Sequence, residues 1–189
     1  PDYSKREREF KILFIGRLVS QKDPFTFLKA IKILNENFKF PIKVYILGDG
    51  PLLKRMKLYC SKNQLEDCVE FKGWLNKDEM LNQFQSSHIQ IASSKAEAMS
   101  MAVLEALSSG LYTISTPVSG NTGMISAGIN GDFFEFEDSQ SLADKISEFY
   151  LNKFVVNYTV PEDFMNEFRN KYDWSEIVKK LNQIFPTGV

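Results

Sequence analysis

With 189 residues, 43% of them hydrophobic and 25% charged, the chain has the composition of a well-packed globular domain, which excludes a largely disordered protein. Its 23 basic and 24 acidic residues give a net charge of -1, so no overall field favours binding to nucleic acid or to an anionic membrane. No apolar run reaches the roughly 18 residues that span a bilayer and no secretory signal is present, so a cytoplasmic location is expected.

Short apolar runs alternate with stretches of helical periodicity, a pattern typical of repeated βα units. The expected strands are 11–15, 43–47, 68–71, 89–92, 112–115 and 133–136. We therefore predict an α/β fold, a single Rossmann-like domain over residues 10–189 with a mainly parallel six-stranded sheet and helices on both faces. Residues 1–9 are polar and are expected to be a linker from a preceding amino-terminal domain.

Several helix starts carry recognisable capping signals. These signals are Asp23-Pro24, Gly50-Pro51, Asn76 with Glu79, and Asp173 with Glu176. The first predicts a helix that extends to about Asn37, and the last predicts a closing helix over 173–185. Asn130-Gly131 predicts a tight turn just before the sixth strand.

The loop after the first expected strand, Gly16 to Lys22, brings two cations to the start of a helix. Ligands of open parallel sheets bind outside the carboxyl ends of the strands, so this loop lies where a ligand is expected. Arg17 offers two parallel donors, Lys22 offers a mobile charge, and the helix dipole favours an anion. A solvated loop whose charges bind nothing is equally compatible with this segment.

Gly48-Asp49-Gly50-Pro51 follows the second expected strand and predicts a sharp turn into a helix. A dinucleotide-binding fingerprint needs a third glycine three residues later, and Leu53 stands there instead. A structural role in the turn is therefore favoured over direct contact with a ligand.

Two glutamates, Glu97 and Glu105, flank seven residues after the fourth expected strand. If Ser100 caps the helix, Glu97 lies in the loop before it and Glu105 lies about one turn inside. The two carboxylates then face different parts of a long ligand. In a glycoside hydrolase, by contrast, two carboxylates converge on one bond. Two carboxylates on a solvated face are equally compatible with the motif alone.

These motifs, with Phe71-Lys72-Gly73-Trp74 between the second and the third, occur in one order. Together they resemble the carboxyl-terminal, donor-binding domain of glycosyltransferase family 4 (glycosyl transferases group 1), which are retaining enzymes of the GT-B fold. The resemblance extends from about Phe10 to Tyr150, and the helix containing Trp174 is similar to the closing helix of the family.

The resemblance implies that the chain binds a nucleoside-diphosphate sugar of the UDP or GDP type. The expected activity is hexosyl or N-acetylhexosaminyl transfer to a glycan or lipid-linked saccharide, with retention of configuration, as in polysaccharide biosynthesis. No metal or other cofactor is expected. The acceptor wall is assigned to the amino-terminal domain, through which any contact with the inner face of a membrane would be made. The chain alone is therefore expected to be inactive.

The resemblance also implies roles for individual residues. Arg17 and Lys22, beside Gly16, would hold the diphosphate and stabilise the departing nucleotide. Glu97 would meet the sugar ring, and with Arg17 and Lys22 it forms the expected catalytic set. Glu105 would accept hydrogen bonds from the ribose hydroxyls.

Further donor contacts are implied on either side of these residues. They are Gly73, Trp74 and Leu75 against the base; Ala98, Met99, Ser100 and Met101 at the sugar and phosphate; and Val103 and Leu104 on the ribose and phosphate side. Ala98 stands where many members carry glycine, as does Asp23. Met124 lies near a common glutamate position and receives no role.

Two alternatives to a glycosyltransferase remain at this point. One is a GT-B-fold nucleotide-sugar epimerase, and the other is a non-catalytic nucleotide-sugar-binding module. Glu97 discriminates, because a module that binds only the nucleotide has no need of a carboxylate facing the sugar.

Other chemically active side chains receive structural interpretations. His88 is expected to pack or to be exposed rather than to catalyse. The acidic run Glu135, Glu137 and Asp138 is expected to be a solvated edge rather than a metal site. Cys60 and Cys68 form no Cys-x-x-Cys pair and are expected to pack in a reducing compartment.

Overall fold

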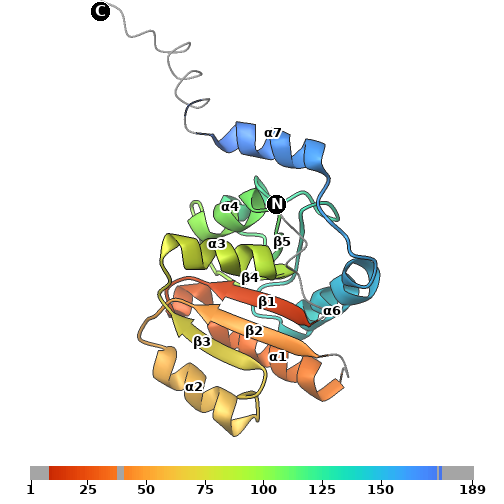
Figure 1. Cartoon of the computed structure of the whole chain (residues 1–189). Helices are drawn as coiled ribbons and strands as arrows, with labels where there is room; N and C mark the ends of the chain where they lie inside the picture. Colours follow the sequence, from red (N-terminus) through yellow and green to blue (C-terminus); the bar gives the residue numbers. More distant parts are fainter. Residues whose placement is uncertain (1–8, 38–40, 174, 176–189) are drawn as a thin grey trace, which may run out of the picture.

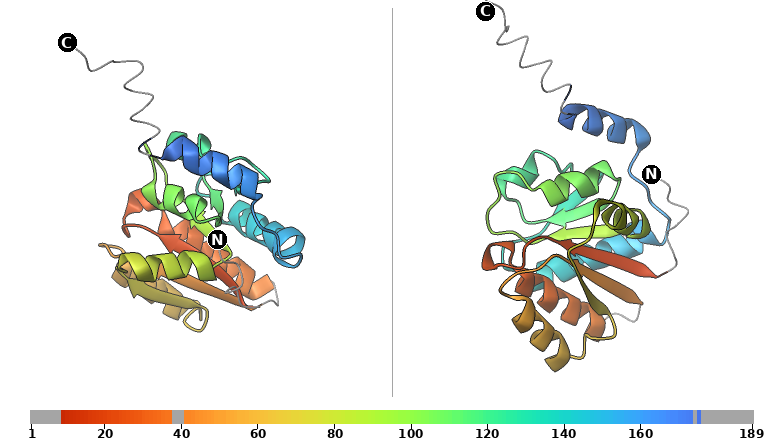
Figure 2. Two further views of the ribbon diagram at one scale, coloured as in Figure 1. Left: turned by 45° about the horizontal axis from the view of Figure 1, so that its top comes forward. Right: turned by 60° about the vertical axis from the view of Figure 1, so that its left-hand side comes forward.

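The computed structural model describes residues 9–37, 41–173 and 175. Within these ranges, strands form a six-stranded sheet in the order β3-β2-β1-β4-β5-β6, with helices on both faces (Figures 1 and 2). Every neighbouring pair of strands is parallel. This is the strand order of doubly wound nucleotide-binding sheets, so the predicted fold class is confirmed.

The strands are β1 (Phe10–Ile15), β2 (Ile42–Leu47), β3 (Val69–Gly73), β4 (Ile89–Ala92), β5 (Tyr112–Ser115) and β6 (Gly131–Phe133). The first five lie where they were predicted, and only the sixth is displaced. The predicted turn before the sixth strand is present at residues 128–130 and includes Asn130, but Gly131 is already in the strand and pairs with Thr113 of β5. A Cβ at Gly131 would lie 2.3 Å from the carbonyl oxygen of Thr113, so glycine permits a close approach of backbones rather than a turn.

The helical elements are η2 (Ser20–Lys22), α1 (Pro24–Asn37), α2 (Leu53–Lys62), α3 (Lys77–Ser86), α4 (Met101–Ser108), α5 (Ser119–Thr122), α6 (Ser139–Phe149), η3 (Tyr150–Phe154) and α7 (Glu162–Tyr172). The predicted start and end of α1 are confirmed. Asn76 and Glu79 form the predicted reciprocal capping box at α3. The predicted closing helix 173–185 falls almost entirely outside the described residues.

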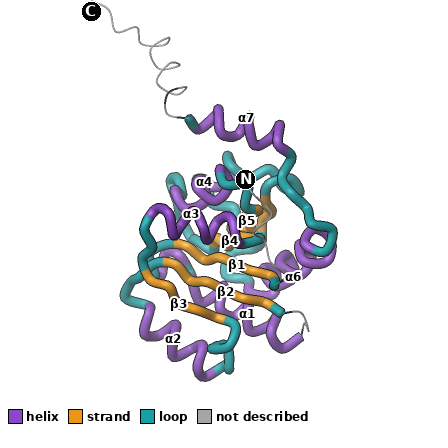
Figure 3. The backbone as a smooth tube through the Cα atoms, viewed as in Figure 1, coloured by secondary structure: helices purple, strands orange, loops and turns teal. Residues whose placement is uncertain are grey.

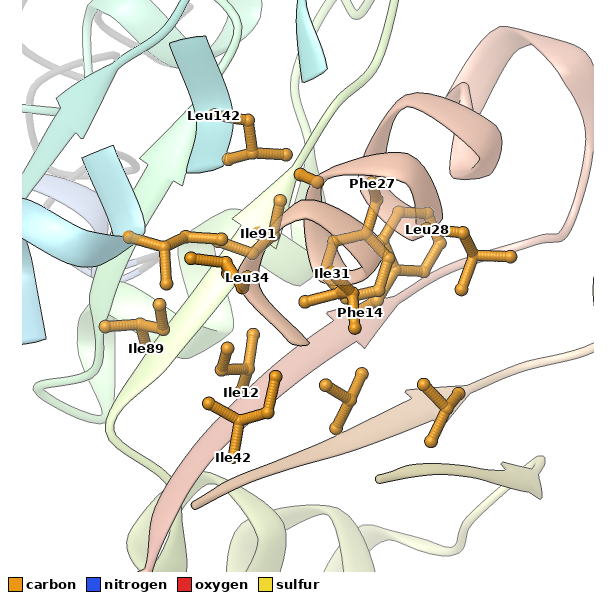
Figure 4. Close-up of a cluster of buried hydrophobic side chains, with 14 of the residues drawn as sticks. Ile12, Phe14, Phe27, Leu28, Ile31, Leu34, Ile42, Ile89, Ile91 and Leu142 are labelled. Atoms are coloured by element: carbon orange, nitrogen blue, oxygen red, sulfur yellow. The ribbon is translucent and has the colours of Figure 1, made fainter. Parts of the chain in front are cut away.

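Alternate residues of the central strands supply two cores, one on each face of the sheet. Ile12 and Phe14 of β1 pack with α1, α2 and α6 in the larger core, whereas Leu13 packs with α3 and α4 on the opposite face. In the larger core, the rings of Phe14 and Phe27 stack with centroids 5.0 Å apart (Figure 4). The tube in Figure 3 shows the strands enclosed between these helical layers. Both faces are thus covered, which leaves the strand ends for a ligand.

Aromatic side chains gather at the amino ends of the strands. We call this group the amino-edge aromatic cluster; its members are Phe10, His88, Tyr112, Phe149, Tyr150 and Phe154. His88 is buried, and its Nδ1 accepts a hydrogen bond of 2.9 Å from the backbone N–H of Lys11. The predicted structural interpretation of His88 is therefore confirmed, in its packed form.

Candidate functional site

The carboxyl ends of β1 and β4 lie side by side at the centre of the sheet. β1 pairs with β2 on one side and with β4 on the other, so successive strands are added in one direction from β1 to β3 and in the opposite direction from β4 to β6. Loops that leave neighbouring strands in opposite directions open a crevice at such a switch point. The loop that carries Lys22 follows β1, and the loop that carries Glu97 follows β4.

Lys22 and Glu97, 75 residues apart in sequence, form an ion pair at this point. Their side chains are 20% and 12% exposed, respectively. The hydroxyl of Ser94, a buried residue, donates a second hydrogen bond of 3.0 Å to the same carboxylate oxygen of Glu97. The stem of Lys22 extends over Gly16, where a Cβ would lie 3.4 Å from the lysine Cε. Two residues predicted for the donor site are therefore in contact and held in place.

The loop that carries Glu97 is fixed by backbone contacts with its neighbours. Gln21 donates a 2.8 Å hydrogen bond from its side chain to the carbonyl of Ala96, and its own carbonyl accepts one from the backbone of Lys95. The backbone N–H of Gly120 donates to the carbonyl of Glu97 at 3.0 Å. A Cβ at Gly120 would lie 2.6 Å from that carbonyl oxygen, which requires glycine there.

The Gly48-Asp49-Gly50-Pro51 turn joins two loops rather than presenting a ligand-binding group. Gly48 has a φ of +121°, and a Cβ there would lie 2.2 Å from the carbonyl oxygen of Gly16. The backbone N–H of Leu18 donates to the carbonyl of Asp49 at 2.9 Å. The structural interpretation of this turn is confirmed, and its consequence is that the Gly16 loop is held against β2.

The other predicted donor residues lie at or after the carboxyl ends of strands: Arg17 follows β1, Gly73 to Leu75 end and follow β3, and Glu105 lies in α4 after β4. Arg17 and Glu105 are both exposed. Gly73 ends β3 and adopts a φ of +68°, Trp74 is 73% exposed, and Leu75 packs partly into the core beneath α3 and α4. Trp74 is therefore exposed in this segment, whereas Leu75 is partly buried.

The start of α4 divides its predicted contacts between surface and core. Ala98, Met99 and Met101 are exposed, and Leu104 is half-buried. Ser100 is the N-cap residue, as predicted, but its side chain is buried and makes no capping hydrogen bond. Val103 has no exposed surface and packs in a core cluster, so its side chain does not line a ligand surface as expected.

A depression of about 540 Å³ opens beside Glu97 at the carboxyl edge. It is lined by Gln21, residues 95–98, residues 117–119 and Phe136. The ammonium of Lys95, one of these lining residues, pairs with the carboxylate of Glu137, which follows Phe136 in the loop after β6. Their hydrogen bond raises the pKa of Lys95 and lowers that of Glu137. We call this feature the Phe136 depression.

Ser94, Gln21 and Gly120 were missed as supporting residues of the site. Ser94 lies in the loop after β4 and Gly120 in the short helix α5 that follows β5, and this position after a strand is the signal that could have found them. The acidic run is used locally: Glu137 pairs with Lys95, and Asp138 accepts hydrogen bonds from two backbone N–H groups at the start of α6. Among the described residues, no group of three or more His, Cys, Asp or Glu could hold a metal ion. No described helix is both long enough and apolar enough to cross a membrane.

Comparison with known proteins decides the family. The model of the family "Glycosyl transferases group 1" matches residues 1–171. The chain belongs to this family. Among relatives, it is 29% identical over 181 residues to the UDP-Gal:alpha-D-GlcNAc-diphosphoundecaprenol alpha-1,3-galactosyltransferase of Escherichia coli, a match that covers 95% of this chain and 45% of that protein. The chain thus spans about half the length of the curated relatives that it matches.

Solved structures of glycosyl transferases show the same fold. The pneumococcal O-GlcNAc transferase GtfA, in complex with UDP and GlcNAc, superposes with a TM-score of 0.81 at 22% identity, over 97% of this chain and 36% of that one. The C-terminal domain of a glycosyl transferase group 1 family protein of Francisella tularensis superposes with a TM-score of 0.74 at 19% identity, over 89% of this chain and 88% of that one. The chain therefore has the fold of the carboxyl-terminal half of a GT-B glycosyl transferase, as predicted.

Proposed function

We propose that this chain is the donor-binding domain of a retaining glycosyltransferase and binds a nucleoside-diphosphate sugar of the UDP or GDP type. The observation that carries the proposal is the contact between Lys22 and Glu97 at the switch point of the sheet. The contact supports the proposal because a ligand that joins a diphosphate to a sugar needs a cation beside a carboxylate.

In this proposal, Arg17 and Lys22 hold the diphosphate. The glycosidic bond of the donor breaks, the glycosyl group passes to an acceptor hydroxyl, and the nucleoside diphosphate leaves with the bonding electrons. The two cations stabilise the charge that develops on the leaving group. Lys22 is suited to this role because an ammonium has three donors, and its ion pair with Glu97 leaves donors for a phosphate.

The test is a series of calorimetric titrations with UDP, GDP and ADP, followed by the UDP- and GDP-linked hexoses and N-acetylhexosamines. We expect one nucleoside diphosphate to bind, and one of its sugar derivatives to bind differently from the free nucleotide. Binding of nucleotides with no effect of the attached sugar would instead indicate a nucleotide-binding module. Absence of binding throughout would contradict the proposal.

Transfer itself is expected to need more than this chain. Transfer requires an acceptor hydroxyl held near the anomeric carbon with water excluded. We assign the wall that holds the acceptor to a preceding domain, as the resemblance to the family implies. The comparison is donor turnover by this chain and by the full-length protein that contains it, each with EDTA present, since no metal is part of the proposal. Comparable transfer by the chain alone would contradict the two-domain arrangement. The acceptor, a glycan or lipid-linked saccharide, and the cytoplasmic location stay predictions.

A further inference from the structure

The Phe136 depression extends from the proposed donor site toward β5 and β6. Glu97 and Ala98 line it, but Arg17 and Lys22 are not among the described residues of its wall. The depression therefore adjoins Glu97, the residue proposed to meet the sugar, but not the two cations proposed for the diphosphate. At about 540 Å³ it falls within the range of roughly 300–1,000 Å³ that is usual for small-molecule sites, and it is large enough for more than one sugar ring.

The wall farthest from the cations carries an exposed aromatic ring between charged residues. Phe136 is 46% exposed, although it is flanked in sequence by Glu135 and Glu137. Glu137 adopts a left-handed φ of 56°, a conformation that side-chain-bearing residues rarely take. In this conformation its carboxylate pairs with the ammonium of Lys95, which lines the depression. Strained backbone of this kind gathers at ligand sites more often than elsewhere.

The charges around the depression neutralise one another. Lys95 pairs with Glu137, and Lys22 pairs with Glu97. The wall therefore carries donors and acceptors of hydrogen bonds without an excess of either charge, and it has no unpaired cation cluster that would select a phosphate or a carboxylate. An apolar ring beside paired polar groups matches a neutral pyranose, which has a C–H face and a rim of hydroxyls.

We propose that the Phe136 depression binds a neutral pyranose of the saccharide acceptor, with Phe136 against the C–H face of the ring and Lys95 and Glu137 at its hydroxyls. The proposal rests on the proposed function, because it takes Glu97 as the residue that meets the donor sugar. It adds to the saccharide acceptor proposed above that the bound ring is neutral, and that residues of this chain contact it beside the wall assigned to the preceding domain. Sugar hydroxyls lying between Glu97 and Phe136 would be oriented toward the anomeric carbon of the donor.

The experiment uses the full-length protein that contains this chain. The probes are the methyl glycosides of glucose, galactose and N-acetylglucosamine, with glucuronic acid and glucose 1-phosphate as charged counterparts. Their binding is followed by saturation-transfer NMR titration, with and without saturating UDP, and UDP affinity is measured separately. The variants are Phe136→Ala, Phe136→Tyr and Lys95→Met. The matched control is Leu151→Ala, since Leu151 is also exposed but lies in η3.

We expect at least one methyl glycoside to bind, and to bind more tightly than the charged sugars. Phe136→Ala and Lys95→Met should weaken this binding tenfold or more, whereas Phe136→Tyr and Leu151→Ala should change it less than threefold. UDP affinity should stay within twofold of wild type in all four variants. A parallel loss of UDP affinity in Phe136→Ala would mean that the ring belongs to the nucleotide site and would overturn the proposal.

Other outcomes separate this proposal from the proposed function. If UDP binds but no methyl glycoside does, or if Phe136→Ala leaves glycoside binding unchanged, the acceptor subsite is wrong and donor binding stands. If Phe136→Ala weakens only the nucleotide sugar, the depression holds the donor sugar and the subsite is wrong. Tighter binding of the charged sugars would also overturn it. If neither UDP nor GDP binds to the wild-type protein, the proposed function fails, and the titrations without nucleotide still decide the subsite.

Discussion

The two edges of the sheet are built from the same strands but from opposite chemistry. At the amino edge, buried aromatic rings surround His88, whose ring nitrogen is satisfied by the backbone of Lys11. At the carboxyl edge, charged side chains that are partly or largely exposed form ion pairs. The loops there contain glycines with positive φ, such as Gly48. One edge excludes water and the other keeps polar groups in reach of a ligand. We therefore expect substitutions at the amino edge to change mainly the stability of the fold, and substitutions at the carboxyl edge to change mainly ligand binding.

The largest expected effect is on the free energy of unfolding, and it comes from a substitution that creates a cavity at the amino edge. Phe10 is fully buried, and its ring lies 5.0 Å from that of Phe154 and 5.9 Å from that of Phe149, centroid to centroid. We expect Phe10→Ala to lower the free energy of unfolding by about 3–5 kcal/mol, because the aromatic cluster cannot close around the lost ring. Chemical denaturation measures the loss.

The same variant should bind UDP normally while it is folded. Titration is done at a temperature where denaturation shows the variant to be more than nine-tenths native, judged from its own curve. A change in UDP affinity under those conditions would show that the amino edge influences the site, and the separation would be lost.

A change at the carboxyl edge should have the opposite profile. We expect Lys22→Ala to weaken UDP binding by about 2 kcal/mol, some thirtyfold, the effect of one lost charge-assisted hydrogen bond. Stability should change little, because Lys22 and its partner are both partly exposed. Lys62→Ala is the matched control, since Lys62 is exposed in the last turn of α2, which leads to the amino edge. Equal UDP affinities in the two variants would rule out Lys22 as a phosphate ligand.

The two carboxylates of the carboxyl edge, Glu97 and Glu105, should differ in which part of the ligand their loss affects. Glu105→Ala is expected to weaken free UDP by about 1.5 kcal/mol, roughly tenfold, because a carboxylate that accepts from ribose hydroxyls is lost. Glu97→Ala should weaken the nucleotide sugar while leaving free UDP within about twofold, since its proposed partner is the sugar ring. Both variants are titrated with UDP and with the UDP-sugar that binds wild type. Loss of free UDP binding in Glu97→Ala would contradict the division of roles.

The sequence was sufficient for most of the fold and for the individual motifs. Alternating βα patterns are local, so five strands and the starts of α1 and α3 could be located from residue order alone. The contact between Lys22 and Glu97 was implied only indirectly, because the adjacency of β1 and β4 is a property of the whole sheet.

What could not be predicted depends on close approach between distant segments. Gly131 was assigned to a turn because glycine is frequent in turns, but glycine also occurs within strands where another backbone approaches closely. The pairing of Lys95 with Glu137 requires the loops after β4 and β6 to meet above β5, and the left-handed backbone of Glu137 has no residue-type signal. Val103 was assigned to the ligand side by position, whereas packing against α7 and Met124 decided its orientation.

The smallest expected effect is on the pH dependence of the free energy of unfolding, and it again compares the amino edge with the carboxyl edge. Cys60 is buried near the amino edge, and burial raises the pKa of its thiol from an ordinary value of 9.0 to about 11. A raised pKa means that the neutral thiol favours the folded state: this contribution is complete below about pH 9 and is lost as the pH rises toward 11. At pH 10 the loss is about 1 kcal/mol.

Other groups also titrate in this range, so the measurement is a difference. We expect the unfolding free energy of wild type to fall between pH 8 and pH 10 by about 1 kcal/mol more than that of Cys60→Ala, in which the thiol is absent. Lys22→Ala should follow wild type, because its change lies at the other edge of the sheet. If wild type and Cys60→Ala have parallel pH profiles, then Cys60 ionises as easily in the folded chain as in the unfolded one. In that case the amino edge admits water, and the contrast with the carboxyl edge would be weaker than its packing indicates.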